Sequence, residues 1–474
     1  MSSFISIFEI LKIGVGPSSS HTLGPWKAAS AWMDWLRTRI PMNVVSVDVS
    51  LYGSLALTGK GHYTDKAIVY GLLQLDPTSV PVGSLQEIYE DVLAENRIRI
   101  DQEADFYFHP ERSIHFLKKE KHPFHPNALK FSVTFLDGSK EEKTYFSTGG
   151  GFIRGEENHP ADSGHGPRAS YLYKNAGELA RLCAETGMSI SAIAMANERG
   201  LRSEQEVREH LRKLWNVMLE SAYEGCHTEG VLPGGLGVAR RAAALNRQLL
   251  RKHDYHDPSG WLEAMKIGGD FRKVLTRVSC LAMAVNEVNA SMGRIVTAPT
   301  NGSAGVIPAV LIYYICFSGR VAGDRDIAAF LLTASEIGKF FRQGATISAA
   351  AGGCQAEIGV SSSMAAAGLT ECLGGTPDQV LMAAEIAAEH HLGLTCDPIG
   401  GLVQIPCIER NSMGAVKAIT ASMIALAGDP EKAVVTLDNV IKAMKETAEN
   451  MSDKYKETSL GGLAANVPVN LTEC

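Results

Sequence analysis

Hydrophobic and polar residues alternate along two stretches in the first third of the chain. Three valines alternate with polar residues over 45–49, which is the period of a half-buried strand. Residues 131–135 repeat this pattern, and the Asp137-Gly138 pair that follows is a strong turn signal for a hairpin. Between these stretches, 84–98 carries apolar residues at helical spacing. The first third is therefore expected to mix strands and helices.

After this region the pattern becomes helical almost to the end of the chain. The segment 154–168 is polar and rich in Gly and Pro, which is typical of a linker. Beyond it, Ser203 with Glu206 and Thr376 with Gln379 have the spacing of capping boxes. Both pairs predict the beginning of a helix.

Two helices near the end of the chain have predicted limits. The helix that begins at Pro377 is expected to end near Gly393, because glycine is common after a helix. The Asp429-Pro430 pair is expected to begin another helix that runs through residue 451.

These patterns predict an α+β protein with four segments. An α/β domain is expected over 1–153, the linker over 154–168, an all-helical domain over 169–460 and a short tail over 461–474. A chain of 474 residues is too long for one hydrophobic core, which agrees with at least two domains.

Composition excludes several classes of protein. The net charge of −7 argues against a nucleic acid or another polyanion as partner. The apolar run 305–317 is shorter than the ~18 residues expected of a membrane span, and the N-terminus lacks the features of a signal peptide. Nine cysteines are an odd number, so we expect reduced thiols in a cytoplasmic protein.

The first stretch that could carry chemistry is "GPSSSHTLGP", residues 16–25, just before a predicted helix. Consecutive hydroxyls and free N–H groups at a helix N-terminus can bind a carboxylate or phosphate. The same residues also suit a purely structural helix cap, so both interpretations stay open.

The second stretch is "GKGHYTD", residues 59–65, after the first predicted strand. His62 lies in a tight turn there, with Thr64 and Asp65 near enough in sequence to orient its ring. A histidine in such a turn can act as a general base near neutral pH. The alternative is a surface turn in which Asp65 caps the next helix.

The third feature is a set of cysteines in irregular segments. Cys354, Cys396 and Cys407 are flanked by glycine and proline, so their backbone can wrap closely around a cofactor. The remaining internal cysteines lie in helical apolar patterns and are expected to be small buried residues: Cys183, Cys226, Cys280, Cys316 and Cys372.

The spacing of the loop cysteines leaves the kind of metal site open. The interval from Cys396 to Cys407 is unlike the C-x2-C spacing of zinc fingers and ferredoxins. Three cysteines rather than four would leave one iron of a [4Fe–4S] cluster open, and an open iron can act as a Lewis acid on a substrate hydroxyl.

Taken together, these stretches resemble a known family. The motifs are "GVGPSSSHT" (14–22), "GHYTD" (61–65), "GGGFI" (149–153) and "APTNGSAGVIPA" (298–309), joined by the three loop cysteines. In this order they resemble the bacterial single-chain iron–sulfur L-serine dehydratases, and the resemblance covers essentially the whole chain.

The resemblance implies an activity and a cofactor. The reaction would convert L-serine to pyruvate and ammonia in amino-acid catabolism and gluconeogenesis, without pyridoxal phosphate. Cys354, Cys396 and Cys407 would be the protein ligands of a [4Fe–4S] cluster in the helical domain. The first domain would resemble the allosteric substrate-binding domain of some phosphoglycerate dehydrogenases, and a homodimer is expected.

The resemblance also suggests roles for individual residues. His62 is the first candidate for the base that removes the α-proton of serine, and His21 is the second. The expected substrate contacts are Ser18, Ser19, Ser20, Thr22, Thr64, Asp65 and Asn301. Cys474 matches the tail cysteine of the family. Because it carries a thiol and a carboxylate, we expect it to fold back and bind the open iron as a substrate mimic until serine displaces it.

Other interpretations remain to be weighed. The glycine run 149–151 resembles the phosphate loop of pyridoxal-phosphate dehydratases, but the lysine-bearing N-terminal segment of those enzymes is missing. The same architecture could act on L-threonine or L-cysteine, as a desulfidase does. A non-catalytic serine or redox sensor and a structural zinc protein are the alternatives from other classes.

Overall fold

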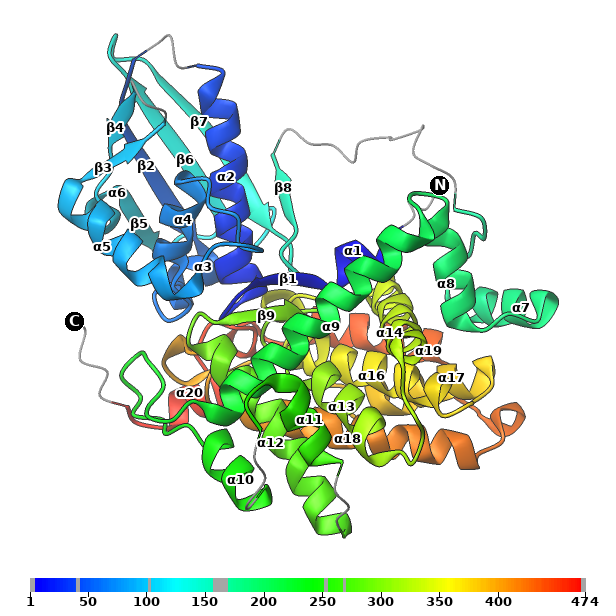
Figure 1. Cartoon of the computed structure of the whole chain (residues 1–474). Helices are drawn as coiled ribbons and strands as arrows, with labels where there is room; N and C mark the ends of the chain where they lie inside the picture. Colours follow the sequence, from blue (N-terminus) through cyan, green and yellow to red (C-terminus); the bar gives the residue numbers. More distant parts are fainter. Residues whose placement is uncertain are drawn as a thin grey trace.

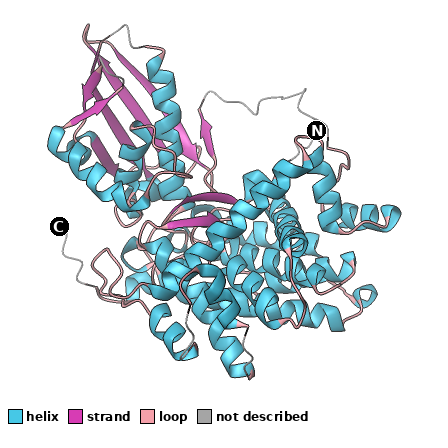
Figure 2. Ribbon diagram, in the orientation of Figure 1, coloured by secondary structure: helices cyan, strands magenta, loops and turns pink. Residues whose placement is uncertain are grey.

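The protein combines a sheet-containing N-terminal part with a larger helical part, and each has its own hydrophobic core (Figures 1 and 2). The computed structural model describes residues 5–39, 43–100, 104–156, 169–250, 255–266 and 270–469. The expected α+β fold is confirmed. No helix within these ranges is long and apolar enough to cross a membrane.

The N-terminal part is built on a seven-stranded mixed sheet. Its strands are β2 (Val44–Tyr52), β3 (Arg97–Arg99), β4 (Asp105–Tyr107), β5 (Ile114–Leu117), β6 (Ala128–Phe135), β7 (Lys140–Ser147) and β8 (Ile153–Gly155). Strand β2 pairs parallel with β4 and β5 and antiparallel with β6. Strands β6 and β7 pair antiparallel, which confirms the predicted hairpin.

Helices cover this sheet and complete its core. They are α2 (Gly24–Arg37), α3 (Gly53–Thr58), α4 (Thr64–Leu72), α5 (Leu85–Glu95) and α6 (Pro110–Ser113). Helix α5 confirms the amphipathic helix expected from the sequence. The ring of Trp32 on α2 stacks on Phe131 of β6 with centroids 5.2 Å apart, so α2 is packed directly on the sheet.

The helical part is a bundle around one deeply buried helix. Its helices are α1 (Ile7–Ile10), α7 (Ala176–Thr186), α8 (Ile190–Arg199), α9 (Glu204–His227), α10 (Ala242–Leu249), α11 (Pro258–Met265), α12 (Phe271–Ala290), α13 (Val306–Phe317), α14 (Asp324–Gly344), α15 (Ala349–Gly352), α16 (Ile358–Cys372), α17 (Pro377–Glu389), α18 (Cys407–Ala427), α19 (Leu437–Asn450) and α20 (Gly462–Asn466). Helix α16 packs against α13, α14, α17 and α18. All its residues except Glu371 are buried, as expected of a helix surrounded by others.

The capping boxes at Ser203 and Thr376 are both present, so the two predicted helix starts are confirmed. Helix α17 ends at Glu389, a few residues before the predicted Gly393.

The prediction of a single helix beginning at Asp429 is wrong. A 3₁₀ turn (Pro430–Lys432) is followed by non-helical backbone, and α19 begins only at Leu437. The reason is a second cap: the Thr436 hydroxyl accepts from the Asn439 N–H at 3.3 Å, which begins a new helix.

A two-stranded ribbon joins the two parts and was not expected from the sequence. Strand β1 (Lys12–Val15) pairs antiparallel with β9 (Arg294–Thr297), which lies within the otherwise helical region. The ribbon lies between the sheet and the helices in Figure 1. Ile7 and Ile10 of α1 also belong to the core of the helical part. The first residues of the chain therefore pack with the helical bundle rather than with the sheet.

Candidate active site

The three loop cysteines lie around the ends of two central helices. Cys354 opens a 3₁₀ turn before α16, and Cys407 is the first residue of α18. Cys396 lies in the loop that precedes the short turn Ile399–Gly401. All three side chains are buried. One ligand atom from each of Cys354, Glu357 and Cys396 lies within 4.8 Å of the others.

An arginine ties these loops together. Arg410 Nη1 lies 3.2 Å from the Sγ of Cys354 and donates to the Thr395 carbonyl at 2.6 Å. Its Nη2 donates to Asp397 Oδ1 at 2.9 Å. Hydrogen bonding with Cys396 and the charge of Arg410 lower the pKa of the Cys354 thiol against the effect of burial. The site therefore favours a thiolate at Cys354.

The other two thiols have the opposite tendency. Hydrogen bonding with Cys354, together with burial, raises the pKa of Cys396. Burial and the charge of Cys354 raise the pKa of Cys407, so this thiol lies within electrostatic range of the first. Three thiolates cannot share a buried site without a compensating cation. A bound metal supplies such a charge and keeps cysteine ligands deprotonated.

A glutamate completes the group around Cys354. Glu357 is half-buried, and burial raises its pKa to about 7 although a hydrogen bond with Thr300 acts in the opposite direction. A Cβ at Gly302 would lie 3.1 Å from both carboxylate oxygens of Glu357. The loop that carries Gly302 therefore approaches Glu357 so closely that a larger residue would crowd the carboxylate. The donor set of buried sulfur atoms with a nearby carboxylate fits a metal centre.

Two histidines from the N-terminal part form a second group. His21 lies in a π-helical turn (Ser19–Leu23) before α2, and such turns are frequent at functional sites. His62 lies in the turn before α4. Both side chains are fully buried, and their ring centroids are 4.6 Å apart.

The ring of His62 presents a free nitrogen. Its Nδ1 lies 2.8 Å from the Thr58 carbonyl oxygen, which can only accept, so Nδ1 carries the proton. In the neutral ring Nε2 then bears the lone pair, and it has no hydrogen-bond partner among the described residues. Burial lowers the pKa of His62 to about 4, which keeps the ring neutral at pH 7.

Both nitrogens of His21 are engaged. Nδ1 lies 2.8 Å from Ser20 Oγ, and Nε2 lies 3.0 Å from Ser54 Oγ. Burial and the neighbouring His62 lower the pKa of His21 well below its ordinary value. Of the two candidate bases, only His62 therefore has a nitrogen available.

The four hydroxyl residues expected at the substrate are all buried in or beside the π-helical turn: Ser18, Ser19, Ser20 and Thr22. Ser18 Oγ accepts from the His21 backbone N–H at 3.1 Å, and Thr22 donates to the His62 carbonyl at 2.8 Å. These two hydroxyls therefore hold the turns that carry the histidines. The Ser20 hydroxyl lies close to His21 Nδ1 and to the carboxylate of Glu457.

Thr64 and Asp65 do not orient the ring of His62, contrary to the expectation from their spacing. The Thr64 hydroxyl donates to the His21 carbonyl at 2.6 Å. Asp65 accepts from Lys60 Nζ at 2.7 Å. The Thr58 carbonyl orients the ring of His62 instead.

Asn301 lies in the loop that joins β9 to α13. Its Oδ1 accepts from the Thr297 hydroxyl at 2.7 Å, and its Nδ2 donates to the Val15 carbonyl at 2.9 Å. Both ends of its amide thus stabilise the ribbon between the two parts of the protein.

A buried glutamate from the C-terminal segment connects the histidines to the cysteines. The Glu457 N–H donates to the Cys396 carbonyl at 2.8 Å, and its own carbonyl accepts from the Ser54 hydroxyl at 2.7 Å. Its Oε2 lies 3.6 Å from His21 Nδ1, and its Oε1 lies 3.6 Å from His62 Nε2. Burial and acidic neighbours raise the pKa of this carboxyl well above its ordinary value.

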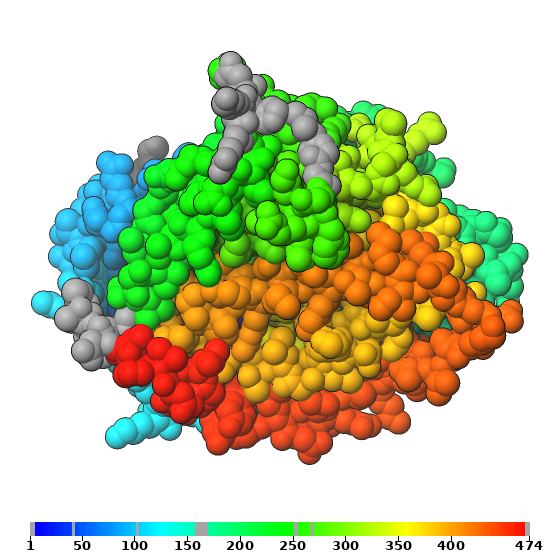
Figure 3. Space-filling model, turned by 90° about the horizontal axis from the view of Figure 1, so that it is seen from below, coloured from blue at the N-terminus to red at the C-terminus, as the bar shows by residue number. Residues whose placement is uncertain are grey.

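The two parts meet closely at this point. A Cβ at Gly61 would lie 2.7 Å from the Gly401 carbonyl oxygen, so the turn that carries His62 packs directly on the cysteine loop. Glycine is required here because any side chain would separate the two backbones. Seen from below, the red C-terminal segment lies on the helical part in Figure 3.

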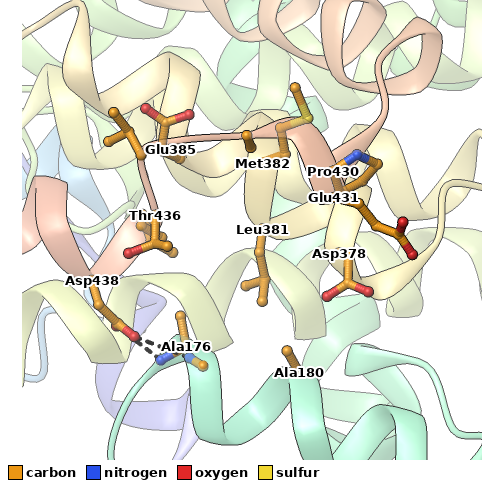
Figure 4. A pocket seen from close by; sticks show the side chains of 14 residues that line it. Ala176, Ala180, Asp378, Leu381, Met382, Glu385, Pro430, Glu431, Thr436 and Asp438 are labelled. Carbon is orange, nitrogen blue, oxygen red and sulfur yellow. Dashed lines mark hydrogen bonds between the residues drawn. The ribbon is translucent and has the colours of Figure 1, made fainter.

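A cavity of about 370 Å³ lies elsewhere, between α7, α17 and the segment 430–438 (Figure 4). None of the predicted site residues lines it. Asp438 accepts from the N–H groups of Ala176 and Gly177 at 3.0 Å each and thereby caps α7. Burial raises the pKa of Glu385, another lining residue, to about 7.

Sequence reasoning missed three charged residues of the site. Glu357 and Arg410 each follow a loop cysteine by three positions, a spacing that places side chains on one face of a helical turn and could have indicated them. Glu457 lies outside every motif, and nothing in the sequence around it indicates its place. The predicted ligand Cys474 lies outside the described residues.

Two family models together match most of the chain. Residues 6–158 match the family model described as serine dehydratase beta chain, and residues 185–464 match that of serine dehydratase alpha chain. The chain is 46% identical over 466 residues to L-serine dehydratase TdcG of Escherichia coli, covering 98% of this chain and 99% of that protein. It is also 46% identical to an L-serine dehydratase of Streptomyces coelicolor, covering 99% and 100% of the two chains. An L-serine dehydratase of Helicobacter pylori is 41% identical, with 98% and 99% covered. The chain therefore belongs to the serine dehydratase family, with the beta-chain and alpha-chain regions in one polypeptide.

Proposed function

We propose that this protein converts L-serine to pyruvate and ammonia with a [4Fe–4S] cluster held by Cys354, Cys396 and Cys407. The observation that carries the proposal is that Cys354 and Cys396 lie in one buried group with Glu357, and that Glu457 connects Cys396 to two buried histidines. Cys407 lies within electrostatic range of Cys354. The names of the relatives, all L-serine dehydratases, support serine as the substrate.

The cluster and the protein have separate tasks. When bound by three cysteines, a [4Fe–4S] cluster supplies an open iron, a Lewis acid that eases loss of hydroxide from the β-carbon. The chain keeps the thiols together: Arg410 binds both Cys354 and Asp397, and helices α16 and α18 begin at the site. The positive ends of these helices favour thiolate ligands.

His62 takes the α-proton of serine. Its Nε2 is unprotonated in the neutral ring and has no hydrogen-bond partner among the described residues, so it can accept a proton from a substrate. The Thr58 carbonyl fixes the other nitrogen and so maintains the ring orientation. Loss of the α-proton and the hydroxyl gives an enamine, which tautomerises and hydrolyses to pyruvate and ammonia in water.

The π-helical turn takes part in binding the substrate. Ser18, Ser19 and Ser20 lie in or beside the turn that carries His21, and the Ser20 hydroxyl reaches toward Glu457 at 3.5 Å. Hydroxyl and backbone N–H groups of such a turn can bind a carboxylate.

Protein purified without oxygen is expected to be brown, to contain about four iron atoms per chain and to release pyruvate from L-serine. Exposure to air should bleach the colour and abolish turnover together, because one iron has no permanent protein ligand and is therefore open to oxidants. The test combines the visible spectrum, iron and sulfide analysis, and a pyruvate assay with L-serine, L-threonine and L-cysteine. A colourless protein with full activity would contradict the cluster, and faster turnover of threonine or cysteine would contradict the substrate.

We also propose that Cys474 is a fourth ligand in the resting protein. Helix α20 packs on the turn Ile399–Gly401, and the Leu463 N–H donates to Asp397 Oδ2 at 2.7 Å. The chain is thus anchored next to Cys396 shortly before its last residues. Cys474 follows Leu463 by only eleven residues in the sequence.

Replacing Cys474 with alanine is expected to leave the iron content unchanged, because three cysteines remain. The half-life of the cluster in air should become shorter, because the fourth position loses its thiol. Absorbance decay after mixing with aerated buffer measures this half-life, and Cys372→Ala is the control. Equal half-lives in the wild type and Cys474→Ala would show that the tail does not bind the cluster.

A further inference from the structure

The carboxylate of Glu457 lies at the centre of the site without a short contact to any of its side-chain neighbours. Its Oε2 lies 3.5 Å from Ser20 Oγ and 3.6 Å from His21 Nδ1, and its Oε1 lies 3.6 Å from His62 Nε2. Direct hydrogen bonds of this type are normally 2.7–3.2 Å long. The backbone of Ala350 also hydrogen-bonds to the carboxylate. The acceptor sites that face the side chains are left incompletely used, because those contacts are longer than direct hydrogen bonds.

The charge around this carboxylate is also incomplete. Within the described residues, its ion contacts are to His21 and His62 alone, and both rings are kept neutral by burial. The nearby Arg410 uses its two terminal nitrogens on Cys354, Thr395 and Asp397. A buried carboxylate without a cation is costly, and a cationic ligand removes that cost.

The backbone of Glu457 adopts a strained conformation. Its φ of +55° lies in the left-handed region, which residues other than glycine seldom adopt. Hydrogen bonds with the Cys396 carbonyl and the Ser54 hydroxyl maintain this conformation from both sides. Strained backbone that is held by its surroundings is typical of functional positions.

We propose that Glu457 binds the α-ammonium group of the substrate and thereby selects amino acids over acids that lack the amine. The assignment rests on the proposed function of the same site. An ammonium group has three donors and one positive charge, which match a carboxylate with unused acceptor sites. An amine held there would bring the substrate close to His62, whose Nε2 lies 3.6 Å from Glu457 Oε1.

Two unreactive ligands separate the amine from the rest of the substrate. L-Alanine keeps the amine and carboxylate of serine but lacks the leaving hydroxyl, and propionate lacks the amine as well. Their dissociation constants are measured by calorimetry on protein purified without oxygen. In Glu457→Gln the shape of the side chain is kept and the charge is removed.

L-Alanine is expected to bind roughly 10- to 100-fold more weakly to Glu457→Gln than to the wild type, the range for a lost charge-assisted hydrogen bond. Propionate should change less than about threefold, because it does not use the carboxylate. Glu457→Asp keeps the charge and should recover part of the alanine affinity. Glu385→Gln, which neutralises a buried carboxyl in the separate cavity, is the matched control and should bind both ligands as the wild type does.

Iron and sulfide are measured in every variant before the titrations, so that loss of the cluster is not mistaken for loss of the ammonium contact. If Glu457→Gln does not retain iron, the comparison of alanine with propionate is made in Glu457→Asp, where alanine alone should weaken. Equal weakening of both ligands, or unchanged alanine binding, would overturn the assignment. In turnover, KM for L-serine should rise more than kcat falls, and a loss confined to kcat would also overturn it.

The proposed function and this assignment fail in different ways. The function fails if the wild type itself releases no pyruvate from L-serine. The ammonium assignment fails if the wild type is active while Glu457→Gln still prefers alanine to propionate as strongly.

Discussion

Replacing Cys354, Cys396 or Cys407 with alanine is expected to remove iron and serine turnover together. All three thiols are buried. Cys354 and Cys396 lie in one group with Glu357, and Cys407 lies within electrostatic range of Cys354. Two thiolates rarely retain a [4Fe–4S] cluster, since cysteine is its usual ligand. Iron analysis and the visible spectrum should show loss of the cluster in all three variants, with turnover below detection.

The control is a buried cysteine in a regular helix. Cys183 lies within α7, and burial raises the pKa of its thiol to about 12, as for an inert side chain. Cys183→Ala should keep its iron and its activity and lose about 1 kcal/mol of unfolding free energy. Full iron content and turnover in Cys407→Ala would contradict the ligand assignment.

His62→Ala is expected to reduce kcat for L-serine by roughly 10²- to 10⁴-fold, the usual contribution of a general base. KM should change little, because the proposed role is exercised in the transition state rather than in binding. With α-deuterated serine, the isotope effect on kcat should increase, since proton removal then limits the rate.

A surface histidine provides the comparison. His115 is exposed and pairs with Asp48 at 3.0 Å on the sheet, away from the site. His115→Ala should therefore keep the wild-type rate. If His62→Ala also kept its turnover number, the proton would have to be taken by another group, and His21 would be the next residue to test.

The sequence predicted the parts of the site whose chemistry is visible in local composition. Cys354, Cys396 and Cys407 are distinguished by glycine and proline around them, and His62 by its short turn. The sequence did not indicate what these residues contact. Thr64 and Asp65 are close to His62 in the chain, yet their hydrogen bonds go to His21 and Lys60.

Parts of the fold could not be predicted either, because they depend on contacts between distant residues. Strand β1 has only four residues, and its partner lies in a region of helical pattern, so no local period indicated the ribbon. Glu457 occupies a polar segment that resembles a surface loop, and its contacts with distant residues such as Cys396 and Ser54 bury it. Features that depend on residues hundreds of positions apart leave little trace in a local pattern.

The ribbon between β1 and β9 also determines the order in which the protein can assemble on the ribosome. The Val15 carbonyl accepts from Asn301, 286 residues later in the chain, and the Pro17 carbonyl accepts from Asn289. At synthesis rates of about 5–20 residues per second, the first segment emerges tens of seconds before these partners exist. The sheet can form meanwhile, because its strands lie within residues 44–155. The turn that carries His21 must wait for these partners. The contacts of Glu457 with Cys396 and Ser54 can form only when the polypeptide is nearly complete.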